Sequence, residues 1–375
     1  MNVKALAPYL GVAFMVTLIA AAPVAISQEP EFHLGIVASV TGPFAAPTKD
    51  TFDGLNAWVK NQGLPGKKFV EDILDDETNA VNAANLFRRL ASDPKTNMIM
   101  LNVNSASAIA AKAFASEYKV PIISGGGATA LGYPADPWMF KVAPANRDSM
   151  KVIIDYMTKH GMKKLAHLYS TDTYGEYDLA ALKELAPKAG IELVAEGFSA
   201  DDTSFNAQFT RIRAEKPDLI YSGASGRAAI LSFKTYKQLA ITTPLCVTQA
   251  AISAAMFTAI GGPQAADGLL SPTQLGVFGE KAGGDTARLY GDLKRALGRT
   301  PVYFNTFGYD AGLIIGAGVA NSDGSRQGIR DALERLKDMP AINGPVTYTK
   351  DDHTGQDFRS IAMGRMENGV AVPAD

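Results

Sequence analysis

The feature that most constrains the fold of this chain is a regular alternation of short apolar segments with amphipathic ones. Phe32–Ser39 and Met98–Leu101 have the length and apolar content of buried strands, whereas Thr48–Asn61 and Tyr177–Ala189 carry apolar residues at helical spacing. Strands that alternate with helices in this way form parallel sheets, which helices cover on both faces. The sequence therefore predicts an α/β protein.

The alternation runs through the chain twice. The first run extends from Phe32 to Ser124, and the second begins again near Met150 and continues to Ser222. A proline follows a strand-like stretch at Val142-Ala143-Pro144 and marks the boundary between the two runs. We therefore expect two doubly wound lobes, each built on a parallel sheet.

The last third of the chain contains too few elements for a third lobe. A strand over Leu269–Gln274 precedes three helices, and a hairpin-like tail includes Asp351–Gly355. These elements must complete the first two lobes, so the chain crosses between them more than once, which favours a hinged cleft. We assign residues 28–143 and 275–342 to lobe 1, and residues 144–274 and 343–375 to lobe 2.

Residues 1–27 have the organisation of an export signal. Lys4 precedes an apolar run at 10–22, and the small residues Ala25-Ile26-Ser27 stand directly before Gln28. The alternative is an uncleaved membrane anchor, because the apolar run is nearly long enough to span a bilayer. Proline and glycine interrupt the run, so cleavage between Ser27 and Gln28 is favoured. The mature protein is then expected in the periplasm, without a lipid anchor because no cysteine stands at the cut.

Composition and charge argue against several functional classes. Lys and Arg number 36 against 38 Asp and Glu, so the net charge of −2 leaves no electrostatic footprint for nucleic acid. Hydrophobic residues make up 47% and charged residues 20%, which is typical of a globular protein rather than a disordered one. The one cysteine, Cys246, cannot form an internal disulfide, and its apolar neighbours predict a buried strand thiol.

The sequence lacks the motifs that specify a catalyst or a cofactor site. The four histidines are scattered, and none has the spacing of a zinc site. No nucleophile-elbow or phosphate-binding-loop motif occurs, and the glycines at 125–127 do not match the dinucleotide-binding pattern. We therefore expect a protein that is not an enzyme and that holds no metal and no cofactor.

Three polar loops follow predicted strands and suit the binding of a small molecule. They are Asn102–Ser107, Ser124–Thr129 and Ser170–Gly175, and ligands of open parallel sheets bind beyond the carboxyl ends of the strands. In the first loop, free N–H groups at a helix start can hold an anion; the alternative is that Ser105 merely caps the helix. In the second, glycines let the backbone approach a ligand, although a tight turn explains them equally well.

A series of short motifs runs along nearly the whole mature chain. They are Gly35-Ile36-Val37, Thr41-Gly42-Pro43, Asp75-Asp76, Val120–Ser124, Gly127-Ala128-Thr129, Tyr174-Gly175, Phe205 and Tyr309-Asp310-Ala311. In their order and spacing the chain resembles the periplasmic solute-binding proteins of hydrophobic amino-acid ABC transporters, the leucine/isoleucine/valine-binding family. The resemblance implies the type I periplasmic binding protein fold, with the ligand trapped between two lobes by hinge closure. It also implies a membrane permease and an ATPase as partners.

The resemblance also implies a set of ligand-binding residues. In that family the ligand carboxylate is held by a serine after the third strand and by backbone and hydroxyl groups of a Gly-Ala-Thr loop. By position, the corresponding residues here are Ser105, Ser107, Gly127, Ala128 and Thr129. Tyr174 matches the tyrosine that the second lobe brings across the cleft.

The chain departs from the family where the family contacts a ligand ammonium group. Gln249 stands at the position of a glutamate, Asn146 stands at the position of a second acid, and Phe44 lies close to the position of an aromatic lid. A buried ammonium group without a carboxylate partner costs several kcal/mol. We therefore expect an aromatic acid, another small carboxylate or an amide, and keep a hydrophobic amino acid as the alternative that the resemblance implies.

Together these features predict the extracytoplasmic solute-binding component of an ABC importer. We expect a monomer whose partners are a small-molecule ligand and the permease and ATPase subunits. A second hypothesis is a sensor of the same fold, which detects an amide or an amino acid and acts on a regulatory partner. The third hypothesis is an extracytoplasmic enzyme on the same scaffold, which no motif in the sequence supports.

Overall fold

The computed structural model describes Met1 and residues 29–101, 103–142, 144–199 and 201–374. The predicted export signal at 1–27, apart from Met1, lies outside these residues. Among the helices described, none is both long and apolar enough to cross a membrane.

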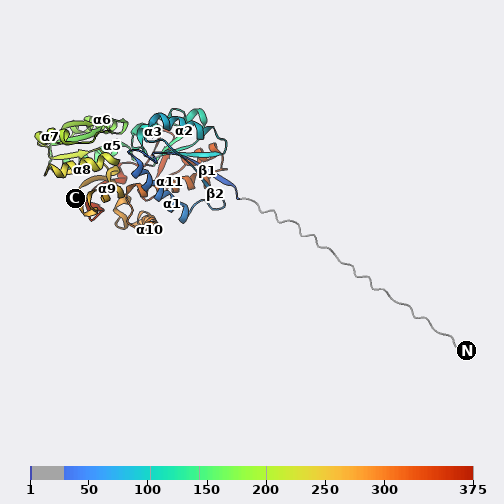
Figure 1. Cartoon of the computed structure of the whole chain (residues 1–375). Coiled ribbons are helices and arrows are strands. Elements are labelled where there is room, and N and C mark those ends of the chain that lie inside the picture. The colour runs from blue at the N-terminus through green and yellow to red at the C-terminus, as the bar shows by residue number, and fades with distance from the viewer. Residues whose placement is uncertain (2–28, 102, 143, 200, 375) are drawn as a thin grey trace.

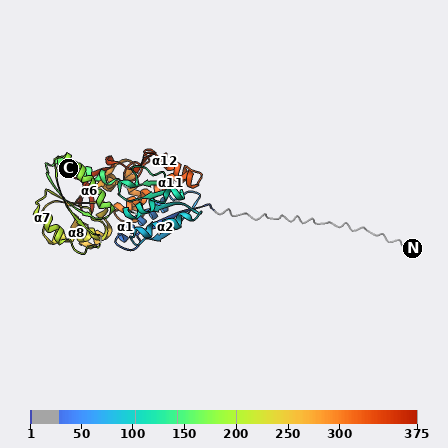
Figure 2. The ribbon, with the colours of Figure 1, turned by 90° about the horizontal axis from the view of Figure 1, so that it is seen from above.

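Two large sheets form the described part of the molecule, and helices cover both faces of each (Figure 1). The first has five parallel strands in the order β2-β1-β3-β4-β5, and the second has seven in the order β14-β13-β10-β9-β8-β6-β7. From above, α6, α7 and α8 lie at one end of the molecule, and α1, α2, α11 and α12 at the other (Figure 2). The predicted α/β class and the two doubly wound lobes are confirmed.

The first sheet lies between two helical layers. Its strands are β1 (Glu31–Ala38), β2 (Lys68–Asp75), β3 (Thr96–Leu101), β4 (Ile122–Ser124) and β5 (Met139–Lys141). Helices α2 and α3 share a core with one face, whereas α1, α10, α11 and α12 share a core with the other. The helices are α1 (Ala45–Asn61), α2 (Ala80–Ser92), α3 (Ser105–Lys112), α4 (Ala115–Tyr118), η1 (Thr129–Leu131), α10 (Gly284–Leu297), α11 (Tyr303–Ala320) and α12 (Arg326–Glu334).

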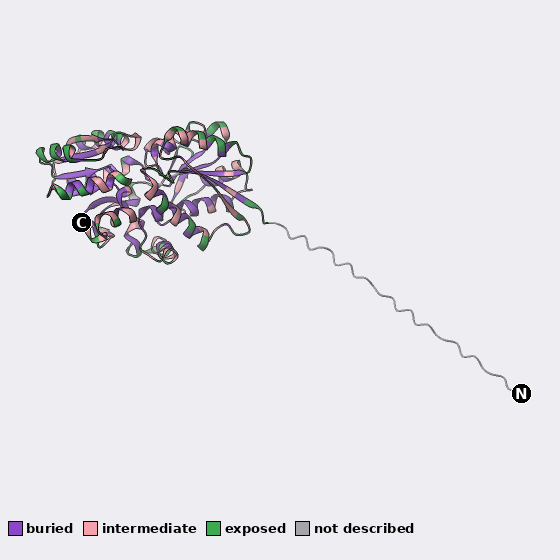
Figure 3. Ribbon diagram, in the orientation of Figure 1, coloured by how far each residue is buried: buried purple, intermediate pink, exposed green. Residues whose placement is uncertain are grey.

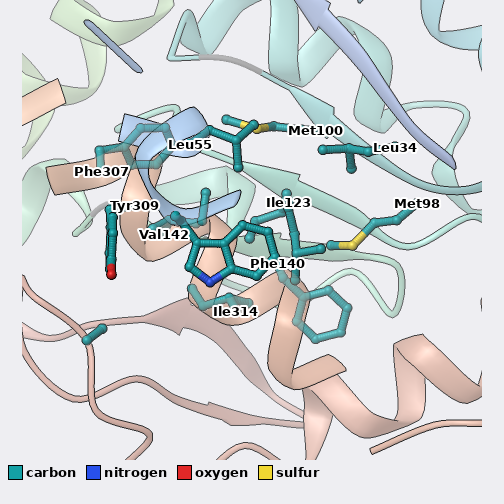
Figure 4. Close-up of a cluster of buried hydrophobic side chains, with 14 of the residues drawn as sticks. Leu34, Leu55, Met98, Met100, Ile123, Phe140, Val142, Phe307, Tyr309 and Ile314 are labelled. Carbon is teal, nitrogen blue, oxygen red and sulfur yellow. The ribbon is translucent and has the colours of Figure 1, made fainter. Parts of the chain in front are cut away.

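Alternate residues of the central strands enter opposite cores. In β3, Met98 and Met100 face the layer of α1 and α11, whereas Ile99 and Leu101 face the layer of α2 and α3. Figure 4 shows the first of these cores, where Phe140 lies among the side chains of the sheet and of α11. Because both faces are buried there, Met98–Leu101 of β3 is apolar at every position, which is the pattern expected of a covered parallel sheet.

The second sheet has the same construction with an antiparallel extension. Its strands are β6 (Lys164–Ser170), β7 (Glu192–Phe198), β8 (Leu219–Ser222), β9 (Leu245–Val247), β10 (Leu270–Gln274), β13 (Ile361–Glu367) and β14 (Val370–Pro373). Strands β6 to β10 pair in parallel, and β13 and β14 are antiparallel. Helices α5 and α6 cover one face, and α7, α8 and α9 cover the other. The helices are α5 (Asn146–Lys159), α6 (Thr173–Lys188), α7 (Asn206–Ala214), α8 (Gly226–Gln238), η2 (Gln249–Ala251), α9 (Ala254–Ile260), η3 (Pro263–Ala266), η4 (Leu275–Ala282) and η5 (Phe358–Ser360).

Burial follows this layered plan. The strands of both sheets are largely buried, and the exposed residues gather on the outer faces of the helices (Figure 3). Cys246 is fully buried in β9, as its apolar neighbours predicted.

Within the described residues, the chain passes between the two sheets three times, after β5, after β10 and after the hairpin of β11 (Thr347–Thr349) and β12 (Asp352–Gly355). The hairpin lies against β5, and the Tyr348 hydroxyl donates a hydrogen bond to the backbone carbonyl of Lys141 at the end of that strand. The lobe limits at 143, 274 and 342 stay a proposal, and the position of the hairpin favours moving the last one toward 355.

Candidate ligand-binding site

A cleft opens between the two sheets at the carboxyl ends of their parallel strands. The space between its walls, together with the open solvent at its mouth, amounts to about 600 Å³. One wall comes from the loops after β1, β3 and β4 and from the start of α11. The other comes from α5, the start of α6 and the segments after β8 and β9. This is the position at which open α/β sheets bind ligands.

Six of the nine residues predicted to contact a ligand line this cleft. They are Phe44, Ser105, Gly127, Asn146, Tyr174 and Gln249. The other three, Ser107, Ala128 and Thr129, are not among the residues that line it. The geometry brings the six together from both walls, and their contact with a ligand stays a prediction.

Ser105 faces the cleft because a neighbouring residue caps the helix in its place. The N-cap of α3 is Asn104, whose Oδ1 accepts a hydrogen bond of 2.9 Å from the backbone N–H of Ser107. The Ser105 Oγ instead accepts a hydrogen bond of 3.2 Å from the backbone N–H of Ala128. Because that oxygen acts as an acceptor, its own hydrogen is free to be donated into the cleft.

Of the three predicted residues outside the lining, Ala128 and Thr129 belong to the loop after β4, and Ser107 lies in α3. Ala128 is fully buried, and its N–H is already bonded to Ser105. Thr129 begins η1, and its carbonyl accepts the N–H groups of Gly132 and Tyr133. The Ser107 Oγ is buried and has no hydrogen-bond partner in the described structure.

The opposite wall presents Asn146, which has a buried acid behind it. The Asn146 Nδ2 donates a hydrogen bond of 2.5 Å to Asp178 Oδ1, and the Tyr221 hydroxyl donates one of 2.9 Å to Asp178 Oδ2. Burial raises the pKa of Asp178 to about 7, against the lowering effect of the Asn146 and Tyr221 hydrogen bonds. Because the amide nitrogen faces Asp178, the Asn146 Oδ1 is left as a free acceptor, buried and without a partner in the described structure.

Gln249 supplies a second free acceptor. It begins η2 directly after β9, is 8% exposed, and its Oε1 has no partner among the described residues. Beside it, the Tyr174 and Thr248 hydroxyls form a hydrogen bond of 2.8 Å. Each buried acceptor left unsatisfied costs roughly 1–3 kcal/mol, so a ligand that donates hydrogen bonds to Asn146 and Gln249 recovers that cost.

Aromatic side chains form the apolar part of the cleft. Phe44 and Tyr174 were expected from the sequence, whereas Tyr303 and Phe304 were missed. Both missed residues lie in the first turn of α11. An apolar aromatic pair at a helix start carries no sequence signal for a cleft, because most such residues pack in the core.

Among the described residues that line the cleft, Asp172 is the one with a formal charge. It caps α6, and its Oδ1 accepts hydrogen bonds from the Ser170 Oγ at 2.8 Å and from the Gly175 N–H at 3.1 Å. The sequence singled out this loop but not Asp172. In the described chain no group of three or more His, Cys, Asp and Glu side chains is placed to hold a metal ion; the expected absence of metal and cofactor stays a prediction.

Two doubly wound lobes with a polar and aromatic cleft between them define a bilobal ligand-binding protein. A family model described as periplasmic binding protein matches residues 31–369, so the chain belongs to this family. The resemblance to the leucine/isoleucine/valine-binding proteins is likewise confirmed by a relative, the Leu/Ile/Val-binding protein BraC3 of Rhizobium johnstonii. It is 26% identical over 96% of this chain and 98% of its own length.

Solved structures share the fold over nearly the whole described chain. An extracellular ligand-binding receptor from Rhodopseudomonas palustris superposes with a TM-score of 0.82 at 25% identity, covering 92% of this chain and 99% of its own. An ABC-transporter solute-binding protein from R. palustris, in complex with benzoate, has a TM-score of 0.82 at 23% identity, covering 92% and 95%. The second likeness shows the fold alone. The relatives are binding proteins, which suggests that this chain is not an enzyme.

Proposed function

We propose that this protein is the extracytoplasmic solute-binding component of an ABC importer and that it closes its two lobes on a small organic carboxylate. Membership of the periplasmic binding protein family supports the transport role. The observation that carries the ligand class is the pair of unpartnered amide oxygens, Asn146 Oδ1 and Gln249 Oε1, in a cleft that has a hydroxyl donor at Ser105.

The ligand we infer has an acidic end, an apolar body and a neutral hydrogen-bond donor. The Ser105 hydroxyl suits a carboxylate, because a charge-assisted hydrogen bond is about twice as strong as a neutral one. Aromatic residues line the same cleft, and its two amide oxygens suit a hydroxyl or amide group of the ligand. A hydroxylated aromatic acid combines all three features.

An α-amino acid fits this cleft less well. Its ammonium group would meet the neutral oxygens of Asn146 and Gln249 and, beside them, Asp172, one of whose oxygens already accepts two hydrogen bonds. A buried ammonium without a full carboxylate partner costs several kcal/mol. Of the three proteins described above, one is named for branched-chain amino acids and another was solved in complex with benzoate; the lining residues favour the second kind of ligand.

Isothermal titration calorimetry of the mature protein tests the ligand class. Benzoate, 4-hydroxybenzoate, benzamide and leucine are titrated in turn, and we expect 4-hydroxybenzoate to bind most tightly and leucine at least tenfold more weakly. Gln249→Glu restores a carboxylate to the cleft and should shift the preference toward leucine. Leucine binding as tightly as the aromatic acids in the wild type would refute the proposed ligand class.

Two further measurements test the transport role and the compartment. The permease and ATPase subunits of the proposed importer should hydrolyse ATP faster when the liganded protein is added, whereas a sensor of the same fold would leave that rate unchanged. The mature protein recovered from the periplasm should begin at Gln28, and a product that retains residues 1–27 would contradict the predicted signal cleavage.

A further inference from the structure

We propose that Lys141 is a positioning residue for the ligand: its buried ammonium group acts through the Gly127–Ala128 peptide and the Ser105 hydroxyl to hold a ligand carboxylate in the cleft. The inference rests on the proposed function, because it requires an anionic ligand. It gives a role to a buried cation that the sequence motifs do not include.

The cleft needs such a cation because its lining has none. Among the described lining residues there is no Lys or Arg, and the charge that Asp172 contributes is negative. A carboxylate that left water for this lining would meet an unfavourable potential unless a positive charge lay nearby. Lys141, the last residue of β5, is fully buried and forms no ion pair with any described residue.

Lys141 connects to the cleft through a continuous chain of hydrogen bonds. Its Nζ donates hydrogen bonds of 3.3 Å to the carbonyl oxygens of Gly127 and Ala128. The Gly127 carbonyl and the Ala128 N–H belong to one peptide group, and that N–H donates to the Ser105 Oγ at 3.2 Å. Hydrogen bonds in a chain polarise one another, so the ammonium group strengthens the donor that Ser105 presents to the cleft.

The same ammonium group connects the two walls of the cleft. It donates a third hydrogen bond of 3.3 Å to the carbonyl of Pro144, in the segment that joins β5 to α5. The Gly127 carbonyl also accepts a hydrogen bond of 3.1 Å from the backbone N–H of Asn146, the first residue of α5. The peptide that supports Ser105 therefore also sets the position of the helix that carries Asn146.

The protonation of Lys141 predicts how this arrangement depends on pH. Burial lowers the pKa of Lys141 to about 7; Asp148 on α5 and Asp352 on β12 oppose this effect, and Lys112 on α3 adds to it. Tyr348 on β11 bonds the backbone carbonyl of Lys141 rather than its side chain. As the pH rises through the pKa the charge is lost, so the affinity for an anion should fall between about pH 6 and pH 8.

Calorimetry with two probes of equal shape tests the role of Lys141. Benzoate carries the charge that the chain of hydrogen bonds should stabilise, and benzamide is its neutral counterpart. We expect Lys141→Met to weaken benzoate binding about tenfold, the loss of one charge-assisted contribution, and to change benzamide binding less than twofold. The wild type should bind benzoate more weakly at pH 8.5 than at pH 6, and Lys141→Met should show a smaller difference, limited to the part that ionisation of Asp178 behind Asn146 contributes.

Two further variants identify the path of the effect. If Lys141 acts through Ser105, the losses of benzoate affinity in Lys141→Met and Ser105→Ala should be non-additive. The double variant should then have the same affinity for benzoate as the single variant that binds it less tightly. Lys112→Met is the matched control, because Lys112 donates to the Ala130 carbonyl of the same loop without reaching the Gly127–Ala128 peptide. It should bind benzoate within twofold of the wild type.

Several results would overturn the proposal while leaving the proposed function intact. They are additive losses in the double variant, equal losses for benzoate and benzamide, or a loss in Lys112→Met as large as that in Lys141→Met. If Lys141→Met does not fold, a wild-type benzoate affinity that is constant from pH 6 to pH 8.5 would refute the role of the ammonium charge. A wild type that binds no carboxylate would refute the proposed ligand class and this inference together.

Discussion

Asp50 offers a test of whether the two lobes close on the ligand. It lies on α1 of the first lobe and is 4% exposed. Its Oδ2 accepts a hydrogen bond of 3.2 Å from the backbone N–H of Ala254, the first residue of α9 in the second lobe. Its Oδ1 pairs at 3.3 Å with Arg299, which belongs to the first lobe. In the proposed hinge motion, opening separates α1 from α9, so the bond to Ala254 contributes to the closed state alone.

The expected size of the effect follows from this geometry. A hydrogen bond to a charged group contributes roughly 1.5–3 kcal/mol, and the lower figure applies here because Arg299 shares the carboxylate and is itself 37% exposed. The pairing with Arg299 is present in both states and cancels. Asp50→Ala should therefore shift closure by about 1.5 kcal/mol, which is about tenfold in the dissociation constant.

Stopped-flow binding and calorimetry with 4-hydroxybenzoate measure this shift. We expect a faster dissociation rate and a nearly unchanged association rate, because the bond forms after the ligand has entered. Asp53→Ala is the matched control. Asp53 lies on α1 together with Asp50 and pairs with Arg299 at 3.1 Å, but it does not contact α9. An affinity within twofold of the wild type in Asp50→Ala, or an equal loss in Asp53→Ala, would refute the reasoning.

Three further predictions concern stability and reactivity. Burial raises the folded-state pKa of Asp178 to about 7 from 3.8, so its contribution to stability is greatest below about pH 4 and is lost as the pH rises to 7. In urea denaturation, the free energy of unfolding of Asp178→Asn should therefore rise relative to that of the wild type across this range. A constant difference would contradict this. Gly308→Ala places a methyl group against the Thr51 carbonyl between α11 and α1 and should destabilise the protein by about 2–3 kcal/mol. Gly291→Ala in α10 has room for the methyl group and should stabilise the protein by roughly 0.5–1 kcal/mol. Equal effects of the two variants in denaturation would refute the packing argument. Burial raises the pKa of the Cys246 thiol, so a thiol reagent should label it only in urea, and rapid labelling of the folded protein would contradict its burial.

Much of the fold was predictable because its signals are local. Runs such as Met98–Leu101 are short and apolar on both faces, which together with the helices around them is the pattern of a covered parallel strand. Helix α8 was not predicted, since polar residues such as Ser232 and Thr235 share its buried face with Phe233 and weaken its apolar stripe. The antiparallel strands β13 and β14 were also missed; β13 pairs with β10, which lies far away in sequence, and β14 pairs with β13.

The candidate site was predictable where a residue follows a strand. Ser105 and Gly127 stand at strand ends, and the resemblance to a known family added Asn146 and Gln249. Tyr303 and Phe304 could not be found in this way, because they reach the cleft from the start of a helix far along the chain. Their place in the lining depends on how α11 packs against α1.

Residue patterns alone predicted the α/β class, the two lobes, the buried thiol and the polar loops at the strand ends. Those features depend on the spacing of apolar residues, which any short window of sequence contains. Only the tertiary structure decided that the Ser105 Oγ accepts a hydrogen bond from the Ala128 N–H, that Asn146 bonds to Asp178, and that the Lys141 ammonium group bonds to the Gly127 carbonyl. These features depend on hydrogen bonds to backbone carbonyls and to buried side chains from distant segments, and a single sequence contains no pattern that records such partners.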